Sequence, residues 1–158
     1  MNDVAAEALI HIGRPSLKPL LKVLGGNDST ANAIAKHYID TIKARRPDLA
    51  NTMTVRQVTG GEASFALGAL GFSEALEPLL KETNANDTPR KLNAAIALVR
   101  IDVPEAQQDR VRAALKKVYN GLPKGFAGVG MRGQLLAAIA HTYDAKMMPF
   151  IYEQAADK

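Results

Sequence analysis

The stretch ALIHIGRPSLKPLLKVL at residues 8–24 returns at residues 66–83 as ALGALGFSEALEPLLKET, with one residue inserted before the proline. Each copy holds an apolar segment, a glycine, and a second segment built around Pro-Leu-Leu. Apolar residues at helical spacing on both sides of the glycine predict two helices joined by a tight turn. Repetition at a period of roughly 30 residues is typical of a solenoid, in which each helix pair buries its apolar face against the next.

The rest of the chain extends this pattern to an all-α solenoid of about five antiparallel helix pairs. We expect the pairs to start near residues 2, 29, 60, 89 and 131. The stretch 47–58 is the least helical, because it holds Thr52 and Thr54, yet its apolar spacing still permits a helix. Thr59 and Glu62 have capping-box spacing and predict the next helix start. Four glycines and a proline predict a long irregular connection over residues 120–130.

The composition and length limit the classes of protein to which the chain can belong. With 158 residues and 47% hydrophobic content, the chain can form one continuous core, so we expect a single domain over residues 1–158. Charged residues interrupt every candidate helix before the roughly 20 apolar residues of a membrane span. The chain enters a repeat almost at once, without a secretory signal, which suggests a piece of a longer repeat protein. The absence of cysteine is compatible with a reducing or an oxidising compartment, with the cytoplasm slightly favoured.

Small residues on the first helix, glycine at the turn and Pro-Leu-Leu on the second helix resemble the HEAT repeat, especially its short form known from phycobilisome lyases. The resemblance is clear at residues 5–24 and 65–81, partial at 94–118 and 135–151, and weak at 30–58. It implies a right-handed superhelix whose second helices line a concave surface that holds another macromolecule. The chromophore handling of the lyases has little support, because the chain lacks cysteine.

No residue pattern predicts catalysis, a metal or a cofactor. The three histidines stand singly on different expected helices, and a surface position is favoured for each: His11, His37 and His141. HEAT-like deoxyhypusine hydroxylases carry His-Glu dipeptides as iron ligands, and this chain has none. We therefore expect a non-catalytic protein.

A glycine-rich motif, GVGMRG at residues 128–133, matches the phosphate-binding pattern G-x-G-x-x-G. The dinucleotide fingerprint needs a preceding strand, and residues 123–127 do not form a credible one. A flexible loop is the favoured interpretation. Lys124 and Arg132 still flank an expected helix N-terminus and are weak candidates for holding an anion.

Positive charge gathers in the second half of the chain. The net charge is +4 and the pI is about 9.4. Six cations follow one another without an intervening acid: Arg110, Arg112, Lys116, Lys117, Lys124 and Arg132. Such a run can meet phosphates or an acidic protein segment, but a solvated helix face is the more common reason for one. Acids on the neighbouring second helices shorten the patch, and the tryptophans that HEAT-like alkylpurine DNA glycosylases use are absent.

The favoured function is a protein-binding or scaffolding module whose concave face recognises an acidic segment of another protein. The residues expected to be exposed there and to contact the partner are Lys18, Lys22, Lys81, Arg112, Lys116 and Lys117. The alternative is a HEAT-like nucleic-acid-binding module that uses residues 110–132. The partner's identity and the oligomeric state stay open.

Overall fold

The computed structural model describes residues 3–49 and 52–156, and within these ranges the chain forms nine α-helices and no strand. The all-α class is therefore confirmed. Short 3-10 turns at Arg14–Ser16, Pro47–Leu49 and Ser73–Ala75 connect some of the helices. The α-helices are α1 (Asp3–Ile12), α2 (Leu17–Leu24), α3 (Ser29–Arg45), α4 (Val55–Leu70), α5 (Leu76–Glu82), α6 (Thr88–Leu98), α7 (Glu105–Asn120), α8 (Phe126–Ala140) and α9 (Met148–Ala156).

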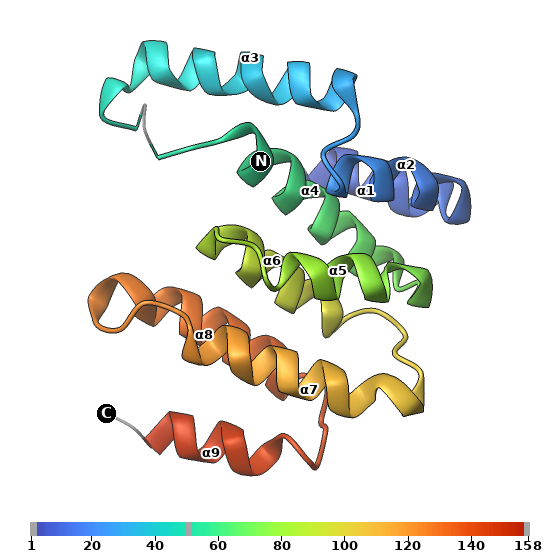
Figure 1. The fold of residues 1–158 in the computed structure, drawn as a ribbon, viewed down its shortest axis with the longest axis vertical. Helices are drawn as coiled ribbons and strands as arrows, with labels where there is room; N and C mark the ends of the chain where they lie inside the picture. The colour runs from blue at the N-terminus through green and yellow to red at the C-terminus, as the bar shows by residue number, and fades with distance from the viewer. Residues whose placement is uncertain (1–2, 50–51, 157–158) are drawn as a thin grey trace.

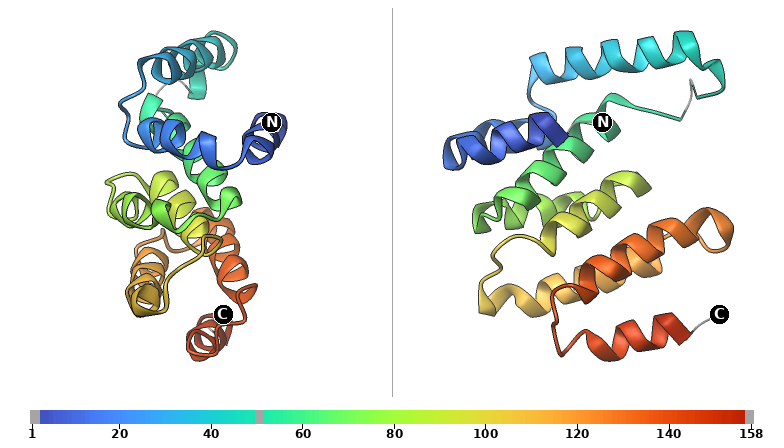
Figure 2. Two further views of the ribbon diagram at one scale, coloured as in Figure 1. Left: turned by 90° about the vertical axis from the view of Figure 1, so that its right-hand side faces the viewer. Right: turned by 180° about the vertical axis from the view of Figure 1, so that it is seen from behind.

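The helices are arranged along one long axis, with α3 at one end and α9 at the other (Figure 1). Helices α1, α4, α6 and α8 contact one another in that order. Helix α2 packs on α4, α5 packs on α6, and α7 contacts both α6 and α8. In Figure 2 (left), α5 and α7 lie on one side of the molecule, and α1 and α8 lie on the other. We call α1, α4, α6 and α8 the first helices, and α2, α5, α7 and α9 the second helices.

The two copies of the repeated stretch fold alike. Gly13 and Gly71 end α1 and α4 with φ angles of 70° and 75°, a backbone conformation that glycine adopts without the steric cost of a Cβ. After each glycine, a 3-10 turn leads directly into the second helix. Pro19 and Pro78 are each the third residue of that helix, where a missing N–H loses no intrahelical hydrogen bond. The repeat in the sequence is thus a repeat in the structure.

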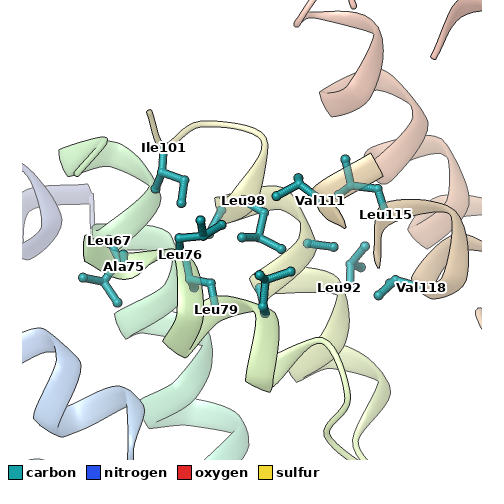
Figure 3. Close-up of a cluster of buried hydrophobic side chains, with 14 of the residues drawn as sticks. Leu67, Ala75, Leu76, Leu79, Leu92, Leu98, Ile101, Val111, Leu115 and Val118 are labelled. Carbon is teal, nitrogen blue, oxygen red and sulfur yellow. The ribbon is translucent and has the colours of Figure 1, made fainter. Parts of the chain in front are cut away.

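One hydrophobic cluster runs from α2 to α9. Figure 3 shows its middle, where Leu67, Leu76 and Leu79 meet Leu92 and Leu98 of α6. Each of these five side chains is at most 6% exposed. Burial of a leucine is worth about 1.5–3 kcal/mol, so this shared cluster fixes the order of the helices.

The expected boundary between the second and third pairs is wrong. The sequence predicted a helix over residues 47–58 and another starting near residue 60. Instead, residues 47–49 form a 3-10 turn, and one helix, α4, runs from Val55 through residue 60 to Leu70. Its N-cap is Thr54, which forms a capping box with Gln57, at 3.2 Å from Gln57 N to Thr54 Oγ1 and 2.6 Å from Thr54 N to Gln57 Oε1. Thr59 lies inside the helix, and its hydroxyl donates to the Val55 carbonyl at 3.0 Å. Residues 50–51 lie outside the described ranges.

This correction changes the count of helix pairs. Helix α3 precedes α4 without a second helix of its own and packs across α4 at the end of the molecule. Its N-cap, Asp28, accepts from Ala31 N at 2.9 Å, and it buries Ala35 and Ile39. The nine described helices therefore do not divide into the five pairs that the sequence predicted.

The prediction of a long irregular connection over residues 120–130 is also wrong. Helix α7 continues to Asn120 and α8 begins at Phe126, so the connection is residues 121–125. The connection folds back on the first turn of α8. A Cβ on Gly128 would lie 1.7 Å from the Pro123 carbonyl oxygen, so only glycine fits there. The glycine-rich motif is therefore part of a helix and not a phosphate-binding loop.

Candidate partner-binding surface

Three successive second helices carry a lysine in their last turn. These are Lys22 on α2, Lys81 on α5 and Lys117 on α7, and all three are exposed. A cation in this position interacts favourably with the helix dipole, which explains its presence without a partner. Their repetition from pair to pair still places positive charge at corresponding points along the molecule. We call these three residues the lysine row.

Contacts between neighbouring helices hold the lysine row together. The Lys117 ammonium donates to Asn84 Oδ1 at 2.7 Å, just beyond the end of α5. Arg56 of α4 donates to the Leu24 carbonyl at 2.7 Å and pairs with Glu82 at 3.4 Å, so it joins the ends of α2 and α5. The last turns of α2, α5 and α7 are thus neighbours at one edge of the molecule.

The lysine row is largely free of internal ion pairs. Lys22 approaches Asp28 Oδ2 at 3.5 Å, and both groups retain contact with solvent. Lys81 has no ion-pair partner in the part of the chain that the structure describes. The same holds for Lys18, which is exposed one turn before Lys22. These ammonium groups are available to carboxylates of another molecule.

A buried charge cluster lies beneath this edge. Glu82 is only 10% exposed and accepts from Arg90 at 2.5 and 3.0 Å, in addition to its pair with Arg56. Burial and the neighbouring Arg90 both lower the pKa of Arg56. Because a buried charge is costly unless paired, these three side chains hold α2, α4, α5 and α6 together, and only Arg56, at 32%, keeps substantial exposure.

Sequence reasoning missed this cluster, although a signal was available. Arg56 and Arg90 lie in the first turns of α4 and α6. A cation is unfavourable at a helix N-terminus, where the helix dipole places partial positive charge. An arginine at such a position therefore indicates a compensating acid elsewhere in the fold, which here is Glu82.

The exposure expected of Arg112 is wrong. Its side chain is only 16% exposed, because Asp144 from the turn before α9 accepts from Arg112 Nε at 2.6 Å. Its other nitrogens donate to Asp109 at 2.5 Å and Gln108 at 3.0 Å. The hydrogen bond from Arg112 lowers the pKa of Asp144. Arg112 thus fastens α9 to α7 and is not free to contact a partner.

The other cations expected at the surface differ in their environments: some are bound to groups of the protein, and others are exposed. Lys116 is half-buried, with its ammonium 5.5 Å from the centre of the Phe150 ring. Arg110 forms two hydrogen bonds with Glu77 of α5, one of them 3.0 Å from Nη2 to Oε2. Arg132 donates to the carbonyls of Pro123 and Leu122, so of the two anion candidates only Lys124 points freely to solvent. Acids and carbonyls distant in sequence thus occupy much of the basic run at residues 110–132.

A groove of about 420 Å³ lies between the α6–α7 connection and the turn before α9. Its apolar wall includes Leu98, Val111 and Ile139, and its polar wall includes Arg112 and Asp144. These two charged side chains bind each other, and Asp102 adds a further carboxylate to the lining. The groove is small and shallow beside the lysine row, and the function proposed below does not use it.

The described part of the chain holds neither a metal-binding cluster of side chains nor a membrane-spanning helix. Within residues 3–49 and 52–156, no three His, Asp or Glu side chains gather as a metal site would require. The three histidines are exposed, as expected. None of the described helices is both long and apolar enough to cross a membrane.

No protein-family model, curated protein or solved structure matches the chain. The resemblance to HEAT repeats is therefore supported only by the sequence pattern described above. The lysine row is supported only by the positions of its residues in the structure. The function that we derive from these two observations is a proposal.

Proposed function

We propose that the chain is a non-catalytic protein-binding module, built as a HEAT-like solenoid, that holds an acidic segment of a partner protein along its second helices. The observation that carries the proposal is the lysine row, with one exposed ammonium group from each of α2, α5 and α7. In the full proposal the helix pairs form a right-handed superhelix and the row lies on its concave side.

The spacing of the row suggests the form of the partner. Packed helices lie about 8–10 Å apart, and in a HEAT-like solenoid successive helix pairs would stack at roughly this step, which we take as the spacing of the lysine row. An extended peptide advances about 3.3 Å per residue, and therefore covers this step in about three residues. The best match is an extended segment with an acidic residue at every third position.

The nucleic-acid alternative loses much of its sequence argument. It relied on residues 110–132, where Arg110 and Arg112 are paired with acids and Arg132 binds carbonyls. Duplex binding depends on neutralising many phosphates at once, and the remaining cations are few. An acidic protein segment, which needs only a few well-placed lysines, is therefore favoured.

The test is fluorescence anisotropy with two labelled 12-residue peptides of equal composition, one with Glu at every third position and one with the same Glu residues together. We expect the spaced peptide to bind more tightly, and its affinity to fall between about 50 and 200 mM salt. A triple variant, Lys22→Glu, Lys81→Glu and Lys117→Glu, should lose about tenfold or more in affinity.

The control removes the same charge from another surface. Lys36→Glu, Lys43→Glu and Arg45→Glu all lie on α3 and change the net charge equally. This control should lose less than about threefold. Equal losses in the two triple variants, or no binding of either peptide, would refute the proposal. Tighter binding of a 20-base-pair duplex than of the peptides would support the nucleic-acid alternative.

A further inference from the structure

The groove between the α6–α7 connection and the turn before α9 holds one carboxylate that the fold itself does not use. Asp102 lines this groove, and in the described part of the chain no hydrogen bond or ion pair reaches its side chain. It does not cap α7, because the N-cap of that helix is Pro104. Its backbone is nevertheless fixed, since the Asp102 N–H donates to the Gly71 carbonyl at 2.7 Å. The fold thus displays this carboxylate at a defined place.

The charges that line the groove do not cancel. Arg112 is the only cation among the residues described at the groove, and Asp144 and Asp109 already accept hydrogen bonds from it at 2.6 and 2.5 Å. The nearest cation before the groove in the chain, Arg100, lies over the Phe65 ring of α4, 5.6 Å from its centre, and does not line the groove. The groove therefore holds a carboxylate without a countercharge in a chain whose net charge is +4.

The wall around this carboxylate is apolar. Figure 3 labels four of its members, Leu98, Ile101, Val111 and Leu115. The alkyl stem of a basic side chain can lie on such a wall while its charged head reaches the carboxylate. A guanidinium is more weakly hydrated than an ammonium group, so arginine loses less on entering a half-enclosed site. The volume of about 420 Å³ is more than one side chain fills, and it leaves room for an apolar neighbour.

A strained tyrosine lies at the edge of the same groove. Tyr143 stands between Thr142 and Asp144, which both line the groove. Its φ angle of 52° is the only positive one at a non-glycine residue within the described ranges, and its side chain is 84% exposed. The chain leaves α1 and α4 through Gly13 and Gly71, where this conformation costs little, whereas a Cβ makes it unfavourable. Backbone strain of this kind is typical of ligand clamps, and an aromatic ring attracts cations.

We propose that this groove receives an arginine side chain of a partner protein, with the guanidinium on Asp102 beside the Tyr143 ring and an apolar neighbour against the wall. Charge selects this occupant, because an acidic segment would be repelled and a neutral one would gain nothing from Asp102. The site does not depend on the lysine row. Asp102 precedes α7 and Lys117 lies in its last turn, so the two sites are roughly 20 Å apart.

An NMR titration of the isotope-labelled protein tests the site through its amide signals. The probe is the peptide acetyl-Gly-Leu-Arg-Gly-amide, and the control peptide carries citrulline, which keeps the shape of arginine without its charge. We expect the arginine peptide to shift the amide signals of Asp102, Val103 and Thr142, with a dissociation constant of about 1 mM or below. The citrulline peptide should bind at least about threefold more weakly. Equal affinities would overturn the proposal.

Two variants locate the effect. Asp102→Asn should weaken binding of the arginine peptide at least about threefold and leave the citrulline peptide unaffected. The matched control is Glu105→Gln, which removes an exposed acid in the first turn of α7, changes the net charge equally and should affect neither peptide. Neither variant should lower the melting temperature, because the Asp102 side chain has no partner in the described part of the chain. Equal losses in the two variants would overturn the assignment to Asp102.

Tyr143→Gly separates binding from stability. It should raise the melting temperature, because glycine relieves the strained backbone, and yet weaken the arginine peptide at least about twofold. A purely structural role does not produce this combination. Unchanged affinity in this variant would overturn the clamp.

Two further outcomes would assign the groove to another occupant. Butylguanidinium that shifts the same amide signals as tightly as the peptide would indicate a small organic cation. Shifts that grow with protein concentration in the absence of peptide would indicate an arginine of a second copy. Either result would overturn the proposal of a partner-protein segment.

Discussion

Helices α4 and α8 are both first helices and lie on either side of α6, but their small residues are packed in opposite ways. The small residues of α4 are covered by α6, and Gly68 lies against the Ala97 backbone. The small residues of α8 are open to solvent. The same residue type therefore creates a tight internal contact in one place and leaves a free face in the other.

The ion pairs near the two helices also differ in how far they are buried. Beside α4, Glu82 and Arg90 are at most 18% exposed and are linked by a fork of hydrogen bonds. Near α8, α7 is tied to the last pair by surface contacts, including Lys146–Asp109 at 3.5 Å between side chains that are 68% and 79% exposed. The middle of the molecule is thus fixed by buried contacts. The last pair is held partly by the Arg112–Asp144 pair, whose side chains are 16% and 23% exposed, and partly by such exposed contacts, which solvent and salt can weaken.

The largest effect should come from breaking the buried cluster. Glu82→Gln keeps the shape of the side chain but leaves Arg56 and Arg90 without a countercharge. We expect a loss of about 3 kcal/mol in the free energy of unfolding, near the low end for buried ion pairs because Arg56 retains some solvent. Urea unfolding followed by circular dichroism measures it.

The control for this variant is Glu74→Gln, which removes the carboxylate that Arg14 binds at 2.6 Å on an exposed surface. It should cost less than about 0.5 kcal/mol. Similar losses in the two variants would show that the cluster beside α4 is no more important than an exposed pair. The contrast between the two regions would then fail.

A pair of alanine substitutions compares the glycines of the two helices. Gly68→Ala gains helix propensity, but its methyl group meets the Ala97 backbone, which cannot move aside easily, so we expect a net loss of about 1–2 kcal/mol. Gly133→Ala meets open space and should gain about 0.5–1 kcal/mol. Urea unfolding measures both changes. Changes of the same sign would contradict the packing difference.

The sequence predicted the helical class and the repeated unit because both depend on local chemistry. Gly13 and Gly71 end their helices as expected, and the leucines beside Pro19 and Pro78 are buried. The predicted start of α4 was wrong because the sequence contains two possible capping boxes within a few residues. Thr54 with Gln57 and Thr59 with Glu62 have the same spacing, and propensity alone does not choose between them.

The surface was harder to predict, because its ion pairs join residues far apart in the chain. The run of cations at residues 110–132 contains no acid, yet Arg110 meets Glu77 and Arg112 meets Asp144 after folding. Lys22, Lys81 and Lys117 are exposed, as expected, and each lies in the last turn of its helix. Three of the aromatic residues at turns and helix ends, Phe126, Tyr143 and Tyr152, are exposed, although packing between repeats would be the usual role for such side chains.

The pH dependence of stability tests the pair that ties α9 to α7. The hydrogen bond from Arg112 lowers the pKa of Asp144, so its carboxylate is stabilised in the folded protein. That contribution is fully present above the unfolded-state value of about 3.9 and is lost as the pH falls through the lower folded pKa. Asp144→Asn should cost about 1 kcal/mol at pH 7, and the difference from the native chain should shrink as the pH falls toward about 3.

Thermal melts from about pH 7 to pH 3 measure that difference, with Asp40→Asn as a control at an exposed site on α3. The effect should be small because Asp109 also accepts from Arg112 and keeps part of its charge compensated when Asp144 is replaced. A double variant, Asp109→Asn with Asp144→Asn, should therefore lose more than the sum of the two single variants. Strict additivity would mean that Asp109 does not replace Asp144. A pH-independent loss from Asp144→Asn would mean that the charge of Asp144 contributes little and that the loss comes from its other hydrogen bond, which it accepts from Lys146 N at 3.0 Å.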